Sequence, residues 1–214
     1  MSIISNIIFP KQTDEYKDIT INIFLKLYFV IELLNIVTGS IVTLFITKLP
    51  PATTINNLCY YQKFILIVIL GPIIEEISFR LWLKKGKYNF QLSIAGALIV
   101  LVLMVHKTLS SNIIVLPVIL SAIILVTSVI ISKLKPMFFQ KYYKYFTYIS
   151  FFAFGFMHIG KYPDLASIHY YLYPIMVLPY ISMGVILGYT RISYGIKYSI
   201  LLHASINLLP TLFM

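Results

Sequence analysis

The chain has 214 residues, of which 59% are hydrophobic and 11% are charged, and its mean hydropathy is +0.89. This composition excludes an ordinary soluble domain and indicates an integral membrane protein. The net charge of +10 does not indicate a nucleic-acid-binding protein, because the lysines lie mostly between apolar runs, where they determine membrane topology. The single cysteine, Cys59, excludes an internal disulfide framework and a cysteine-rich zinc site.

Apolar runs long enough to cross a bilayer follow a polar lead-in over residues 1–20 and continue to the C-terminus. The sequence therefore predicts an all-α, polytopic transmembrane bundle. We expect about seven membrane-spanning helices, at residues 21–47, 64–83, 91–106, 112–132, 146–160, 171–190 and 195–213.

The lysines and arginines between these spans predict the orientation of the bundle. With seven spans, twelve of the 17 basic residues fall on the side of the N-terminus, four fall on the opposite side, and Arg80 lies within a span. Cytoplasmic loops retain positive charge, so we expect a cytoplasmic N-terminus and a C-terminus on the other side of the membrane.

The second span carries Glu75, Glu76 and Arg80 near its middle. Each ionisable side chain in mid-bilayer costs about 2.5–3.5 kcal/mol on insertion scales, so these groups need partners or a water-filled cavity. Glu76 and Arg80 are four residues apart on one helix face and are expected to pair. Glu75 has no local cation and is the candidate reactive group. Pro72 beside Gly71 predicts a kink that opens the helix near Glu75.

Two later spans carry polar residues where lipid-facing side chains would be expected, namely His158, and His203 with Asn207. His203 and Asn207 are four residues apart and project from one helix face. A rise of about 1.5 Å per residue, counted from the cytoplasmic lysines, places these three residues and Glu75 in one layer. That layer lies toward the cytoplasmic half of the membrane.

A carboxylate, two imidazoles and a carboxamide in a low-dielectric site form a hydrolytic centre. Glu75 can take a proton from water, and His158 can orient that water or protonate the leaving amine. His203 and Asn207 can supply N–H donors to the oxyanion of a tetrahedral intermediate. The neighbouring ion pair would fix the orientation of Glu75.

Three motifs in this order resemble the CPBP family of intramembrane proteases, also called the Abi or CAAX prenyl protease 2 family. They are EExxxR at residues 75–80, FxxxH from Phe154 to His158, and HxxxN at residues 203–207. The resemblance covers about residues 64–210. It implies a helical bundle with a cavity open to the cytoplasm and an endopeptidase activity of class EC 3.4. It also implies the roles given above for Glu75, Glu76, Arg80, His158, His203 and Asn207.

The resemblance implies further expectations about organisation. Residues 1–63 form an N-terminal interfacial segment with the first span, and residues 64–214 form the protease domain. The stretch between the first two motifs is longer than the family pattern, which indicates an inserted helical hairpin near residues 91–132. His106 lies nearer the usual spacing, but Val102 stands where phenylalanine is expected, so we favour His158.

The expected partners are the lipid bilayer and a membrane-associated peptide or protein substrate, with no nucleic acid. We expect a multi-pass protein of the plasma (inner) membrane, with its active site open toward the cytoplasmic side. A glutamate-type mechanism needs no metal, so no cofactor is expected.

Three alternatives remain open at this point. The first is a proton-coupled membrane transporter, because Glu and His chains in membranes often carry protons. The second is a non-proteolytic membrane adaptor or immunity protein that acts by binding. The third is a zinc enzyme that uses Glu75, His158 and His203 as metal ligands.

Overall fold

The computed structural model describes residues 15–45, 58–84, 89–108, 136–161 and 170–213, and within these ranges all regular secondary structure is helical. The predicted all-α class is confirmed for this part of the chain. The elements are α2 (Ile21–Phe45), α3 (Tyr60–Phe64), η1 (Ile65–Leu70), α4 (Gly71–Arg80), η2 (Leu81–Leu83), α5 (Asn89–Thr108), α7 (Pro136–Met157), η4 (His158–Lys161), η6 (Tyr170–Leu172), α8 (Tyr173–Met176), α9 (Leu178–Tyr194) and α10 (Ile196–Thr211).

Among the described residues, two stretches are long and apolar enough to cross a membrane, Ile21–Leu44 and Tyr170–Tyr194. They match the first and sixth predicted spans, and four other predicted spans coincide with helices in the structure. The span at 112–132, the second half of the predicted inserted hairpin, lies outside the described residues. The number of seven crossings, the cytoplasmic N-terminus and the two-part domain division stay predictions.

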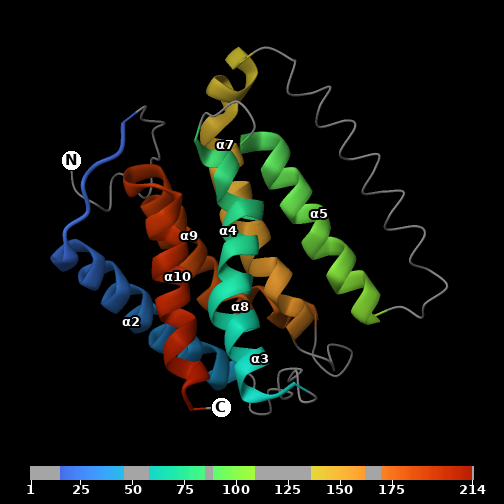
Figure 1. Cartoon of the computed structure of the whole chain (residues 1–214). Coiled ribbons are helices and arrows are strands. Elements are labelled where there is room, and N and C mark those ends of the chain that lie inside the picture. Colours follow the sequence, from blue (N-terminus) through green and yellow to red (C-terminus); the bar gives the residue numbers. More distant parts are fainter. Residues whose placement is uncertain (1–14, 46–57, 85–88, 109–135, 162–169, 214) are drawn as a thin grey trace.

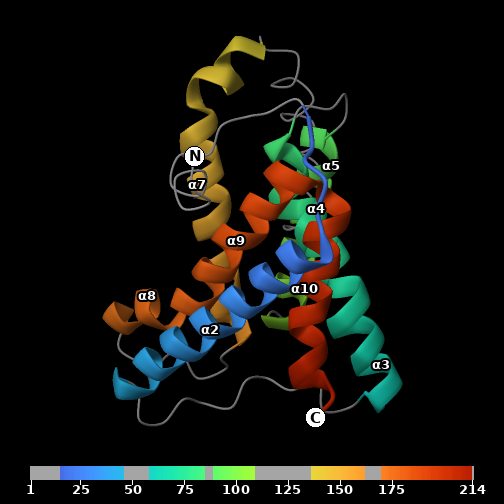
Figure 2. The same ribbon diagram turned by 90° about the vertical axis from the view of Figure 1, so that its left-hand side faces the viewer.

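The helices pack around α9, which contacts α2, α7 and α10 (Figures 1 and 2). Small residues allow the close approach of α7 and α9. A Cβ atom on Gly188 would meet the Phe151 ring at 2.1 Å, and one on Gly155 would meet Ile181 Cγ1 at 2.3 Å. Phe154, which is fully buried, occupies the centre of this packing and belongs to the main hydrophobic core. This packing brings the end of α7 into the interior of the bundle.

A tight turn at Gly195 reverses the chain between α9 and α10. Gly195 has φ of 108°, a value that L side chains rarely adopt, so a glycine suits this position. The turn lays α10 beside α4, as Figure 1 shows. Before the turn, Arg191 donates from Nε to the carbonyl of Arg80 and from Nη2 to that of Leu81, both at 3.2 Å. Arg191 thereby satisfies carbonyl groups that the end of α4 leaves unpaired.

The second predicted span is a helix with a π-helical segment, η1, before α4. Gly71 N–H donates to the carbonyl of Leu66, five residues earlier, as in a π-helix. A Cβ atom on Gly71 would lie 2.9 Å from that carbonyl oxygen, so a glycine fits there. The structure thus shows a π-helical register directly before the glutamates, and the predicted kink that opens the helix near Glu75 stays a prediction.

Candidate active site

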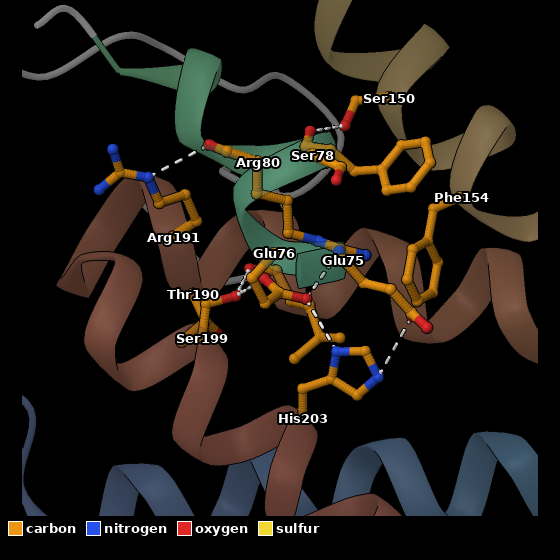
Figure 3. A network of polar contacts seen from close by, with 12 residues as sticks. Glu75, Glu76, Ser78, Arg80, Ser150, Phe154, Thr190, Arg191, Ser199 and His203 are labelled. Carbon is orange, nitrogen blue, oxygen red and sulfur yellow. Dashed lines mark hydrogen bonds and ion pairs between the residues drawn. The ribbon is translucent and has the colours of Figure 1, made fainter. Parts of the chain in front are cut away.

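Three elements bring Glu75, His158 and His203 together in the interior of the bundle. Glu75 projects from α4, His158 begins η4 directly after α7, and His203 projects from α10. Glu75 Oε2 lies 3.7 Å from Nε2 of both histidines (Figure 3 shows Glu75 facing His203). The side chains of His158 and His203 are 3% and 1% exposed, and that of Glu75 is 22% exposed. His158 and His203, which follow Glu75 in the chain by 83 and 128 residues, thus both lie near its carboxylate.

The predicted pairing of Glu76 with Arg80 is present. Arg80 Nη1 lies 2.6 Å from Glu76 Oε1, and both side chains are fully buried. The Arg80 guanidinium also lies 4.0 Å from the centroid of the Phe154 ring. Two side chains of α10 complete the environment of Glu76: Ser199 donates to Oε2, and His203 Nδ1 lies 3.0 Å from Oε1. Glu76 is a buried carboxylate held by three side chains.

The contacts of the two imidazoles assign their tautomers. His158 Nδ1 lies 2.8 Å from the carbonyl oxygen of Phe154, which can only accept, so Nδ1 carries a proton. His203 Nδ1 faces the carboxylate of Glu76, which accepts in the same way. In their neutral forms both rings therefore direct an Nε2 lone pair toward Glu75. A separation of 3.7 Å exceeds a direct hydrogen bond and suits a water that bridges Glu75 and one of the two imidazoles.

Aromatic side chains hold His158 in place. The Phe154 ring lies 4.7 Å from the imidazole of His158 and 5.7 Å from that of His203. On α9, Tyr180 stacks on His158 with a centroid distance of 4.3 Å and an interplanar angle of 24°. Phe154, the motif residue four positions before His158, thus contacts both imidazoles and Arg80.

Asn207 lies one turn beyond His203 on α10, and its amide points to the π-helical segment. Its Nδ2 donates to the carbonyl of Ile67 at 3.0 Å. The second N–H of the same amide group is not required for that bond. The role of Asn207 as an oxyanion donor stays a prediction that depends on this second N–H.

Two further expectations for the site concern His106 and a bound metal ion. The side chain of His106, the alternative to His158, lies outside the described residues. Within the described ranges, no group of three or more His, Cys, Asp or Glu side chains has a geometry that could hold a metal ion. The expectation that the enzyme needs no metal stays a prediction.

The sequence interpretation missed two contributors to the site, Ser199 and Tyr180. A signal for Ser199 was available, because it lies four residues before His203 on the face that also carries Asn207. Tyr180 has no such signal. Its stacking on His158 depends on the way α9 packs against α7, which the spacing of residues within one helix does not report.

The chain matches a known protein-family model. The model described as "Type II CAAX prenyl endopeptidase Rce1-like" matches residues 58–209, which is more than two thirds of the chain and includes every residue of the site. No curated protein and no solved structure matches the chain.

Proposed function

Because the chain belongs to the Rce1-like family of type II CAAX prenyl endopeptidases, we propose that it hydrolyses a peptide bond with a water molecule activated by Glu75 and His158. One observation supports this mechanism above the others. A single carboxylate oxygen of Glu75 faces Nε2 of two buried histidines at equal distances of 3.7 Å. Glu75 Oε2 and His158 Nε2 are two acceptors that match the two protons of one water molecule, so they are suited to bind, orient and deprotonate it, and His203 Nε2 lies beside the same space.

The first step is attack of this water on the scissile carbonyl carbon. Glu75 takes one water proton, the resulting hydroxide forms the new C–O bond, and the carbonyl oxygen becomes an oxyanion. The C–N bond then breaks, and the leaving amine receives the proton by way of Glu75 and His158. Atoms and charge balance without an additional reactant.

His203 and Asn207 stabilise the oxyanion in this proposal. His203 Nδ1–H is already bound to Glu76, so donation to the oxyanion comes from a proton on Nε2. That proton makes His203 an imidazolium ion, whose positive charge lies next to the Glu76 carboxylate and the developing oxyanion. Glu76, held by Arg80 and Ser199, serves as the fixed counter-ion of this group.

The proposed substrate is a membrane-associated peptide or protein, and the proposed location is the plasma membrane. The proposed site opens to the cytoplasmic side, and the contacts of three basic residues indicate which end of the bundle faces the cytoplasm. Lys84 Nζ donates to the carbonyl of Glu15, and the backbone N–H of Lys17 donates to the carbonyl of Ser193. The guanidinium of Arg191 donates to the hydroxyl of Tyr16. These lysines and this arginine gather where α4 ends and α9 turns into α10. Retention of positive charge in the cytoplasm favours that end as the cytoplasmic one.

The test is cleavage of a quenched fluorescent peptide library, with and without farnesylated members, by protein purified in detergent. Glu75→Gln and His158→Ala are the active-site variants. Glu32→Gln is the matched control, since it makes the same carboxyl-to-amide change within the first span. We expect equal cleavage by the parent and the control, and cleavage that is at least about 100-fold slower in the two active-site variants. Equal cleavage by Glu75→Gln would contradict the proposal.

The same preparations distinguish the alternatives. In proteoliposomes, pH-driven proton flux that is lost in Glu75→Gln would favour a transporter. Full biological function of well-expressed Glu75→Gln and His158→Ala variants would favour an adaptor or immunity protein. Farnesylated and unmodified peptides compete directly in the library, so the preferred class of substrate follows from the same measurement.

A further inference from the structure

We infer that Asn207 is a positioning residue that replaces the hydrogen-bond donor missing at Pro72 and thereby holds Glu75 opposite the two histidines. The positioning role rests on the proposed function. The hydrogen bond that carries it is a property of the fold and is tested separately.

The backbone of η1 shows why the carbonyl of Ile67 lacks a backbone N–H donor. In a π-helix the carbonyl of residue i accepts from the N–H of residue i+5. Ile67 would therefore accept from residue 72, which is a proline and has no N–H. The N–H of Gly71, which an α-helical register would supply to Ile67, donates to Leu66. Regular helix geometry thus offers the carbonyl of Ile67 no donor.

Asn207 supplies that donor from the neighbouring helix. Its Nδ2 lies 3.0 Å from the carbonyl oxygen of Ile67, and both groups are partly buried. An unsatisfied carbonyl at this depth in a membrane protein is costly, so the bond stabilises the π-helical register. Pro72 and Asn207 are therefore complementary, because one removes a donor and the other provides it.

This bond is part of a series along one face of α10. Ser199, His203 and Asn207 are spaced by four residues and all point to the helix that carries the glutamates. The first two bind Glu76, and the third binds the backbone two turns before Glu75. The helix is thereby fixed against α10 at Ile67, before Glu75, and at Glu76, directly after it.

Glu75 depends on such support because its own carboxylate is weakly held. Its Oε2 atom is buried and has no hydrogen-bond partner among the side chains that the structure describes. The 3.7 Å distances to His158 and His203 therefore depend on the rotation and depth of the α4 backbone. A change of register in η1 rotates α4, and about 1 Å of misplacement of a reacting group costs on the order of 10²-fold in rate.

The experiment compares Asn207→Ala, Pro72→Ala and the double variant with the full-length parent in detergent. Alanine at position 72 restores an N–H that can reach Ile67. Ser205→Ala is the control on α10, because within the described part of the chain that hydroxyl bonds only to the carbonyl of Leu201 in its own helix. The rate of amide hydrogen exchange over residues 65–75 measures the stability of the helix, and kcat for peptide cleavage measures how well Glu75 is positioned.

In Asn207→Ala we expect exchange over residues 65–75 to be about 3- to 10-fold faster, as for the loss of one hydrogen bond inside a membrane protein. In the double variant we expect exchange within about 2-fold of Pro72→Ala, and a kcat at least about 3-fold above that of Asn207→Ala. Position 72 contributes nothing to the reacting atoms, so this recovery of kcat can only come through the backbone.

Two results would overturn the inference. Exchange that is equally fast in Asn207→Ala and the double variant would show that no donor is missing at Pro72. Restored exchange without any recovery of kcat would show that the bond stabilises the helix but does not position Glu75. If the parent cleaves no peptide, the proposed function fails, and the exchange measurement alone still decides whether the bond between Asn207 and Ile67 holds the helix.

Discussion

Glu75 and Glu76 are adjacent in the chain, yet their carboxylates occupy different environments connected by one histidine. Glu76 is fully buried and is bound by Arg80, Ser199 and His203 Nδ1. Glu75 is partly exposed, and its Oε2 faces Nε2 of the same His203 at 3.7 Å. The ring of His203 therefore connects a carboxylate held by structural contacts with one that is available to react. This division of roles leads to the first prediction.

Replacing each glutamate singly by glutamine separates the effect on the reaction rate from the effect on folding stability. Glu75→Gln should lower kcat by about 10²- to 10⁴-fold, the range for loss of a general base, with little change in the unfolding temperature. Glu76→Gln leaves the buried charge of Arg80 without its counter-ion, which costs about 3–5 kcal/mol of folding free energy. Peptide cleavage and thermal unfolding in detergent measure the two effects. A large loss of stability in Glu75→Gln would contradict the assignment.

Ser199 is expected to support the reaction through Glu76. Its hydroxyl carries one proton, which lies within hydrogen-bond reach of both Glu76 Oε2 and the carbonyl of Leu187, so Ser199→Ala removes a donor that these two acceptors share. We expect kcat to fall by about 10- to 150-fold, which corresponds to about 1.5–3 kcal/mol for one hydrogen bond to a charged group. Ser199→Thr, which keeps a hydroxyl, tests for rescue. Unchanged kinetics in Ser199→Ala would show that Arg80 and His203 alone hold the carboxylate.

The stack of Tyr180 on His158 predicts a difference between two substitutions. Tyr180→Phe keeps the aromatic face and should keep kcat within about 3-fold of the parent, whereas Tyr180→Leu removes the stack, worth about 0.5–1.5 kcal/mol. We expect Tyr180→Leu to lower kcat by about 3- to 10-fold and to change the pH–rate profile, because His158 takes part in proton transfer. An equal loss of kcat in the two variants would assign the effect of Tyr180 to its hydroxyl group, which both variants lack.

The sequence predicted the site to the extent that it depends on spacing within one helix. The pairing of Glu76 with Arg80 is an i,i+4 relationship, and His203 and Asn207 share a face for the same reason. The π-helical register of η1 was not predicted, because apolar side chains alone do not distinguish it from an α-helix. Contacts between helices, such as Tyr180 on His158 and Ser199 on Glu76, depend on packing angles that one-dimensional patterns do not contain.

Metal removal distinguishes a water activated by Glu75 from a water bound to zinc. Both histidines donate from Nδ1, His158 to the carbonyl of Phe154 and His203 to Glu76, an arrangement that also occurs behind metal ligands. The proposed mechanism nevertheless requires no Lewis acid, since the proton goes to Glu75 and the oxyanion is bound by N–H donors. We expect kcat to be unchanged after dialysis against a strong chelator, with less than about 0.1 mol of zinc per mol of active protein, well below the one ion per site that zinc catalysis needs. Loss of cleavage on chelation, with recovery on addition of zinc, would instead identify Glu75, His158 and His203 as metal ligands.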